Sequence, residues 1–279
     1  MDISEDYQAK LFPYAYNILG SINDAQDVVQ DVIVNHIESN RDNITNTSAY
    51  LVKSVINKSI NLKKRSKKMD GQTTWLPEPI ATESPDKNIN SQEIISYAML
   101  VLLEYLDPRE RGVFILKQAF DYSHQEIAEV FSISIENSRQ LLSRAKNTLK
   151  EQGSDFNLNN PPPNDFLSEY VDIIRNGEVK KLEEMLSERI TAQTDGGGKI
   201  KVLSEFTPGI NAVAQLTMRG YDLYLNKCRI EFERLNHFPA LLYYNGDKLV
   251  CCQIFHVDAG TDKIHHMYTV VDPQKLKNL

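Results

Sequence analysis

Cysteine is scarce in this sequence, and the few cysteines present are poorly spaced for cross-linking or for binding a metal ion. Only Cys228, Cys251 and Cys252 occur among 279 residues. An odd, sparse set is typical of a chain kept in a reducing compartment. No second Cys or His pair stands at zinc-finger spacing. We therefore expect neither a disulfide framework nor a metal site.

Long apolar runs and a net positive charge are also missing. The N-terminal segment MDISEDYQAK is acidic and lacks the apolar core of a secretory signal. No stretch approaches the roughly 20 apolar residues that a helix needs to cross a bilayer. The net charge is −7 at pH 7, so any contact with nucleic acid must come from local basic patches. We expect a cytoplasmic protein with no membrane partner.

Two changes in composition divide the chain. Residues 71–90 contain three prolines and show no helical periodicity. Residues 153–164 read GSDFNLNNPPPN, and three consecutive prolines favour a stiff spacer. These two linkers predict three domains, at residues 1–70, 91–152 and 165–279.

The first two domains show the periodicity of helices, and the third does not. In residues 23–39 the apolar residues recur every three or four positions: Ala25, Val28, Val29, Val32, Ile33 and Ile37. A second stripe, from Leu51 to Leu62, runs into a basic tract. The third domain predicts helices at 165–176, 178–187 and 210–225, and strands at 190–194, 199–203, 228–235, 240–244, 249–257 and 264–271. Helices followed by a meandering sheet indicate an α+β domain.

Residues 122–150 have the pattern of a helix-turn-helix. Ser123 and Glu126 can form a capping box, and Ser134 can cap a second helix that begins at Ile135. Residues at the exposed start of that helix could contact base edges, and the basic residues further along suit phosphates. The predicted DNA-contacting set is Glu136, Asn137, Arg139, Gln140, Ser143, Arg144 and Lys146. A plain pair of helices with a solvated face is the alternative.

A basic tract at residues 53–68 contains no acid. Its bases are Lys53, Lys58, Lys63, Lys64, Arg65, Lys67 and Lys68. Such a tract attracts phosphate irrespective of sequence, and Asn57 and Asn61, one turn apart, could contact bases. The alternative is a solubilising helix end, where lysines also favour the helix dipole.

In order along the chain, LFPYAYNILGSINDAQDVVQDVI, SAYLVKSVINKSINLKKRSKK and LDPRERGVFILKQAFDYSHQEIAEVFSISIENSRQLLSRAKNTL resemble extracytoplasmic-function sigma factors over about 150 residues. The resemblance implies an alternative sigma factor that directs RNA polymerase to promoter DNA, with residues 135–149 reading the −35 element. It implies a contact with the β′ clamp helices of core polymerase through Asp24, Asp27, Gln30 and Asp31. It also implies opening and reading of the −10 element by Asn57, Lys58, Asn61, Lys63, Lys64, Arg65, Lys67 and Lys68.

Three further strings resemble the subgroup of these sigma factors that carries a SnoaL-like C-terminal domain. They are WLPEP (Trp75, Leu76, Pro77, Glu78 and Pro79), DGGGK (Asp195, Gly196, Gly197, Gly198 and Lys199) and DPQKL (Asp272, Pro273, Gln274, Lys275 and Leu276). The last is similar to NPDKL, with Asp for Asn and Gln for Asp. The resemblance implies two all-α sigma domains, the second a helix-turn-helix, followed by a cone-shaped α+β domain that regulates them in cis.

The glycines of DGGGK fit a hairpin turn between strands 190–194 and 199–203, because glycine accepts a positive φ. Three glycines exceed what a tight turn needs, and a bare loop lets another segment approach closely. We hypothesise that this loop lies near the WLPEP segment or the sigma domains and helps to set their relative orientation.

Catalysis must be weighed, because SnoaL-like folds resemble polyketide cyclases. The candidate groups are Asp195, Asp222, His237, His256, His265 and His266. Adjacent strand residues such as His265 and His266 should face opposite ways. We favour a domain that is not an enzyme and uses no cofactor, with an unidentified small ligand as a candidate partner. The alternatives are a small-molecule-binding or cyclase-like enzyme domain fused to a DNA-binding module, a stand-alone helix-turn-helix repressor, and a sigma-like remnant that no longer initiates transcription.

Overall fold

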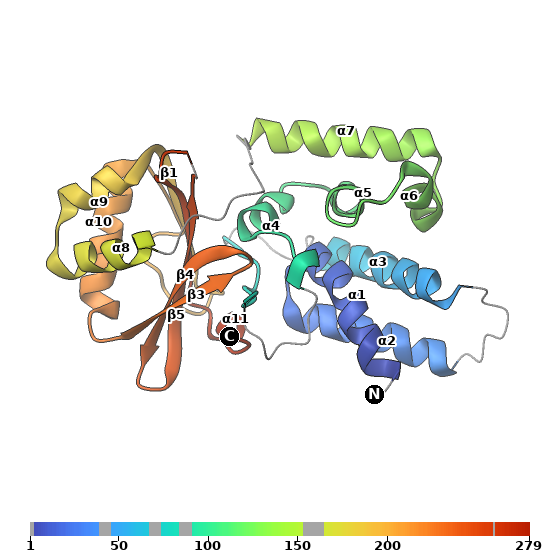
Figure 1. Cartoon of the computed structure of the whole chain (residues 1–279), viewed down its shortest axis with the longest axis horizontal. Coiled ribbons are helices and arrows are strands. Elements are labelled where there is room, and N and C mark those ends of the chain that lie inside the picture. The colour runs from blue at the N-terminus through green and yellow to red at the C-terminus, as the bar shows by residue number, and fades with distance from the viewer. Residues whose placement is uncertain (1–2, 39–45, 67–73, 84–90, 153–164, 259) are drawn as a thin grey trace. The chain divides into compact units, whose positions relative to one another are not determined.

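The computed structural model describes residues 3–38, 46–66, 74–83, 91–152, 165–258 and 260–279 (Figure 1). These fall into two compact units. The first comprises Met1–Gly71, Ser84–Ile95 and Met99–Phe156, and the second Gln72–Glu83, Ser96–Ala98 and Asn157–Leu279. The second unit therefore contains the WLPEP segment as well as the C-terminal domain. Lys67, Lys68 and the proline spacer lie outside the described residues.

The first unit is helical. Its N-terminal half consists of α1 (Ile3–Leu19), α2 (Ile22–Glu38) and α3 (Thr47–Ser66). The apolar stripe predicted on α2 is buried from Ala25 to Val32, but Ile37 is 67% exposed. The stripe therefore meets the core only along the first three turns of the helix.

The second half of this unit contains the short helix η1 (Ser91–Glu93), α4 (Tyr97–Leu103), α5 (Pro108–Gln118), α6 (His124–Phe131) and α7 (Ile135–Glu151). The first two residues of α4 belong to the second unit. Both predicted caps of the helix-turn-helix are present. Ser123 and Glu126 form a reciprocal capping box on α6, and the Ser134 side chain accepts a hydrogen bond from the Asn137 amide on α7. Between the two helices Ser132 adopts φ 53°, which closes the turn.

Helix α3 packs against α5 and α6, so the two halves of the first unit share a core. Gly112 on α5 marks the closest approach. A Cβ atom at this position would lie 2.8 Å from Ile60 Cδ1 and 3.0 Å from Phe131 Cζ. Tyr14 on α1 stacks on Phe120, with ring centroids 3.8 Å apart. The absence of a side chain at Gly112 therefore allows α3, α5 and α6 to meet.

The second unit is built on one mixed sheet of six strands in the order β2-β1-β6-β5-β4-β3. The strands are β1 (Leu186–Asp195), β2 (Phe206–Pro208), β3 (Arg229–Leu235), β4 (Phe238–Asn245), β5 (Lys248–Val257) and β6 (Ile264–Val270). Only β1 and β6 pair in parallel. The helices are α8 (Asp165–Asn176), α9 (Val179–Met185), α10 (Ile210–Gly220), its π-helical continuation η2 (Tyr221–Leu225) and the short α11 (Pro273–Leu276).

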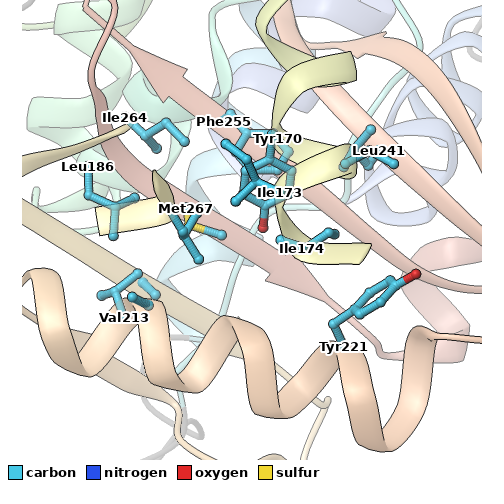
Figure 2. Packing of buried hydrophobic residues seen from close by; sticks show 14 of the residues in the cluster. Tyr170, Ile173, Ile174, Leu186, Val213, Tyr221, Leu241, Phe255, Ile264 and Met267 are labelled. Carbon is cyan, nitrogen blue, oxygen red and sulfur yellow. The ribbon is translucent and has the colours of Figure 1, made fainter. Parts of the chain in front are cut away.

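Helices α8, α9 and α10 lie on one face of this sheet, and large side chains fill the space between (Figure 1). Figure 2 shows Tyr170 of α8 beside Phe255 of β5, with ring centroids 4.8 Å apart in edge-to-face contact, and Met267 of β6 close by. The space between these helices and the sheet is thus occupied by packed aromatic and aliphatic side chains.

The predicted strand at residues 199–203 is wrong, and so is the hairpin that it implied. The amides of Lys199 and Ile200 both donate to the carbonyl of Gly196, at 3.2 and 3.0 Å, which folds the chain into a turn in place of a ladder. The segment that pairs with β1 comes later in the chain: it is β2, in which Thr207 lies opposite Ala192 of β1. An alternating apolar pattern of five residues could not reveal this local competition for backbone hydrogen bonds.

Candidate DNA-reading helices and the site of the linker strap

The seven residues predicted to contact DNA on α7 are all exposed: Glu136, Asn137, Arg139, Gln140, Ser143, Arg144 and Lys146. The opposite face is buried through Leu142, Ala145 and Leu149. Burial, and after it the nearby cations Arg139, Lys117 and Lys146, lower the pKa of His124. The exposed face thus carries Arg139, Arg144 and Lys146 against one acid, Glu136.

Lys63 on α3, one of the predicted DNA contacts, is buried in this structure. Its Nζ donates to the carbonyl of Leu19 at 3.0 Å and pairs with Glu104 at 2.8 Å. Arg111, 1% exposed, pairs with the same carboxylate and donates from Nε and Nη2 to the Asn17 carbonyl, at 3.2 and 3.0 Å. Burial alone would raise the pKa of Glu104, but Arg111 and Lys63 lower it below its ordinary value.

Asn57 is also engaged by the second half of the unit. Its Nδ2 donates to the carbonyl of Val130 at 3.1 Å, and the neighbouring Lys53 donates to the carbonyl of Glu129 at 2.6 Å. The remaining described residues of the predicted −10 set lie at or near the surface, with Asn61 and Arg65 exposed and Lys58 and Lys64 half-buried. In this arrangement α3 presents only part of its predicted DNA-reading face.

The four residues predicted to contact polymerase, Asp24, Asp27, Gln30 and Asp31, are all exposed on α2. Asp31 forms an ion pair of 2.6 Å with Lys58, which joins a residue of the predicted polymerase contact to one of the predicted −10 contacts. The pair is solvent-exposed and hence weak.

The three strings WLPEP, DGGGK and DPQKL meet at one buried carboxylate in the second unit. Asp195 Oδ2 accepts from the amide of Leu76 at 2.8 Å and pairs with Lys275 Nζ at 2.7 Å. Lys275 also donates to the Leu76 carbonyl at 2.5 Å and lies 4.3 Å from the centre of the Trp75 ring. Both charged side chains are under 9% exposed. We call residues 74–83 the strap, and its first part is fixed here.

The glycines of DGGGK allow this convergence. A Cβ atom on Gly197, at φ 63°, would lie 2.2 Å from Asp272 Oδ2, and one on Gly196 would lie 2.2 Å from the Ile200 carbonyl. Asp272 caps α11 by accepting from the Gln274 amide. Gly198 and Lys199 are exposed and Leu276 is buried. Only the first two glycines are therefore required by close contact within the described chain.

A second attachment of the strap was not predicted. Asn236, at the turn between β3 and β4, is fully buried and contacts Ile80 and Tyr97. The Tyr97 hydroxyl in turn donates to the Pro77 carbonyl at 2.8 Å. An Asn between two predicted strands signals a turn, but the partners of that turn lie more than a hundred residues away.

The catalytic candidates do not assemble into an acid–base pair with Asp195, which is held by Lys275. His256 lies opposite His266 across β5 and β6, while their neighbours Phe255 and Met267 face the helices. The expectation that His265 and His266 face opposite ways is wrong. A register shift makes His265 an extra residue, and both rings lie near His256, at 6.3 and 5.4 Å.

Burial lowers the pKa of His256 and of His266 to about 4, so both rings are neutral near pH 7. His266 Nδ1 lies 2.7 Å from the Thr191 hydroxyl. Asp222 is exposed on η2, whereas the two histidines lie on the face of the sheet turned away from the helices.

Comparison with known families identifies the helical unit. Residues 3–69 match the model of Sigma-70 region 2, and residues 96–149 match that of Sigma-70, region 4. These matches cover α1–α3 and α4–α7 respectively, and they define the class: a sigma-70-type transcription initiation protein. We use the names region 2 and region 4 below.

Full-length relatives narrow the class. The chain is 26% identical to the ECF RNA polymerase sigma factor SigJ of Mycobacterium tuberculosis, over 99% of this chain and 93% of that one. It is 22% identical to the probable ECF RNA polymerase sigma factor SigI of the same species, over 98% and 93%. The crystal structure of M. tuberculosis SigJ matches with a TM-score of 0.77 at 21% identity, over 98% of this chain and 97% of that one.

The chain is an extracytoplasmic-function sigma factor with sigma-70 regions 2 and 4. The predicted fold class is confirmed: two helical sigma domains are followed by an α+β domain with a mixed sheet. Among the described residues, no helix is both long and apolar enough to span a membrane.

Proposed function

We propose that the C-terminal domain tunes the sigma activity of this chain in cis, by holding the strap that follows region 2. The observation that carries the proposal is the buried Asp195, which joins the strap to two other segments of the domain through Leu76 and Lys275. Without Lys275 the buried Asp195 would keep an uncompensated charge, and without the strap it would lose the hydrogen bond from the Leu76 amide, so each segment stabilises the placement of the others.

Region 2 and region 4 must also separate for the proposed DNA contacts to form. Asn57 and Lys63 are proposed to contact the −10 element, yet both are bonded to groups in region 4. The packing of α3 on α5 and α6 is therefore a state in which the proposed −10 contacts are incomplete. Core polymerase, bound through Asp24, Asp27, Gln30 and Asp31, would favour the separated state over this one.

A small ligand could regulate the C-terminal domain only by binding the docked and the released strap with unequal affinity. The proposed partners are thus core RNA polymerase and promoter DNA. The domain is proposed to act by holding the strap and not by catalysis, since the candidate histidines lie apart from Asp222 and the carboxylate of Asp195 is already paired.

Two glycines of DGGGK offer a matched test. Gly197→Ala and Gly198→Ala both place a side chain at positive φ, at 63° and 67°, but only the first meets the Asp272 carboxylate. The strain common to both is about 1 kcal/mol. We expect Gly197→Ala to change factor-dependent transcription by purified core polymerase severalfold, and Gly198→Ala to behave like the wild type. Equal outputs from the two variants would refute regulation through this site.

A further inference from the structure

Three of the hydrogen bonds of Asn236 join the strap to the start of region 4. Its Oδ1 accepts from the Ile80 amide at 2.8 Å, and its own amide donates to the Ile80 carbonyl at 2.8 Å. Its carbonyl accepts from the amide of Tyr97 at 3.2 Å. Ile80 belongs to the strap, and Tyr97 is the first residue of α4 in region 4.

The turn that carries Asn236 suits this role. Asn236 and His237 have φ of 46° and 68°, the consecutive positive values of a tight hairpin turn, and asparagine tolerates them better than most side chains. The His237 amide donates to the Thr82 hydroxyl at 3.1 Å, and Ala81 forms a β-bridge with Leu235. The strap therefore extends the edge of the sheet for a few residues at the end of β3.

The two attachments shorten the linker. From Ser66, where α3 ends, to Tyr97 there are 31 residues, which when fully extended reach about 110 Å. With Leu76 held by Asp195, only ten residues, about 35 Å, remain on the region 2 side. Tyr97 is bonded directly to Pro77 and Asn236, so the region 4 side adds little.

The shortened reach, little more than about 35 Å, is less than the separation of the two promoter elements. Centres about 25 base pairs apart are roughly 85 Å apart in B-form DNA. The widths of the two domains must then cover the difference. The attachments of the strap at Asp195 and Asn236, which we call the strap attachments, remove most of the linker length that would otherwise help to span it. Releasing both attachments restores about 75 Å of contour length between Leu76 and Tyr97.

We propose that Asn236 is a positioning residue that limits how far region 2 and region 4 can separate, and thereby opposes simultaneous engagement of the −10 and −35 elements. The proposal deepens, and rests on, regulation in cis by the C-terminal domain. It assigns that regulation to a hairpin outside the three strings.

The first measurement is hydrogen exchange on the full-length protein. Asn236→Gly tolerates the positive φ and keeps the backbone hydrogen bonds but removes the side-chain amide, including the oxygen that accepts from the Ile80 amide, so the turn should survive. Asp262→Gly makes the same change at an exposed residue with φ 53° in the turn before β6, away from the strap. We expect exchange of the Ile80 amide to rise about tenfold in Asn236→Gly and to stay unchanged in Asp262→Gly. Unchanged exchange of the Ile80 amide in both variants would show that the Asn236 side chain does not hold the strap, and would overturn the proposal.

The second measurement is binding of the reconstituted holoenzyme to promoter DNA. On DNA carrying both elements, Asn236→Gly should bind about fivefold more tightly than the wild type. On DNA whose −35 element has been replaced, the two should bind equally, since region 4 then has no site to reach. Asn236→Asp, which restores an oxygen acceptor, should return both exchange and binding toward the wild type.

An equal gain on both DNAs, or none on either, would overturn the proposal. These outcomes are separate from a failure of the proposed function. That failure would appear as equal transcription with Gly197→Ala and Gly198→Ala. The role of Asn236 is tested separately, by exchange of the Ile80 amide and by whether the gain in binding depends on the −35 element.

Discussion

Helices α3 and α7 both carry predicted DNA contacts, but they differ in what else those residues do. On α7 the seven residues are exposed, and the helix is anchored through its opposite face. On α3 the same kind of residue also has structural partners: Lys63 neutralises a buried carboxylate, and Asn57 donates to a backbone carbonyl in the last turn of α6. All of the predicted DNA contacts on α7 in region 4 are therefore exposed, whereas some of those on α3 in region 2 are engaged by region 4.

The difference shows what a basic side chain in a sigma factor can contribute besides binding phosphate. The long apolar stem of lysine allows Lys63 to pass through the packed face of α3 and place its ammonium beside Glu104. The same cation would be available to DNA only after α3 leaves α5. A single residue can thus favour the closed unit in one state and the promoter complex in another.

The largest expected effect distinguishes Lys63 from Arg144. Lys63→Met removes one partner of a buried ion pair and should lower the free energy of unfolding of the helical unit by about 3 kcal/mol. Arg144→Met, at an exposed position of α7, should change it by no more than about 0.5 kcal/mol. Urea unfolding followed by a fluorophore on Cys introduced at the exposed Glu151 measures both.

The order of the two effects should be reversed when binding of each variant to an isolated −35 duplex is measured. Arg144→Met is expected to weaken binding and reduce the slope of log affinity against log salt by about one, as for a lost phosphate contact. Lys63→Met should leave that slope unchanged. A loss of stability in Arg144→Met as large as that in Lys63→Met would remove the distinction between the helices.

A smaller effect is expected from acid. The pKa of Glu104 is held below its ordinary value of 4.5 by Arg111 and Lys63 despite burial. A carboxyl group with a lowered pKa in the folded state stabilises that state above the unfolded value, and the contribution is lost as pH falls through the folded one. The helical unit should therefore lose stability as pH falls below 4.5.

Glu104→Gln supplies the control for this acid effect. The variant should be less stable near neutral pH, because Arg111 and Lys63 lose their counter-charge, and its stability should vary less with pH below 4.5. The measurement is the urea midpoint as a function of pH, with the same fluorophore at position 151. An unchanged pH dependence in Glu104→Gln would show that other carboxyl groups govern the acid response.

The smallest effect is expected at the ion pair of Lys58 with Asp31. Both side chains are substantially exposed, at 39% and 62%, and such pairs contribute about 0–1 kcal/mol. Lys58→Met should therefore lower stability by less than 1 kcal/mol, and this loss should shrink further in 1 M salt. A large, salt-independent loss would mean that α3 depends on exposed residues as much as on Lys63.

Features that depend on neighbouring residues were predictable from the sequence. Helix α8 spans the predicted 165–176, and the caps at Ser123 and Ser134 are where the residue types placed them. The exposed face of α7 followed from its periodicity. Each of these depends on hydrogen bonds or apolar spacing within a few residues, which one chain displays directly.

Features that depend on partners far along the chain were predicted poorly. Nothing near Lys63 reveals that Glu104 and Arg111 surround it, and nothing near Asn236 indicates Ile80 and Tyr97. The failure at residues 199–203 has a related cause, because the Gly196 carbonyl captured two amides that a strand would have needed. The hypothesis placed the DGGGK loop near the WLPEP segment or the sigma domains, but the contact with DPQKL and the centre at Asp195 emerged only from the structure.

Trp75 provides an intrinsic fluorescence signal for the position of the strap. It is the only tryptophan in the chain, and its ring lies 4.3 Å from the ammonium of Lys275. A nearby cation and partial burial give an indole an emission different from that in water. The fluorescence of the unmodified protein therefore reports in real time whether the strap is seated, so its release by polymerase, DNA or a candidate ligand can be followed by titration without any label.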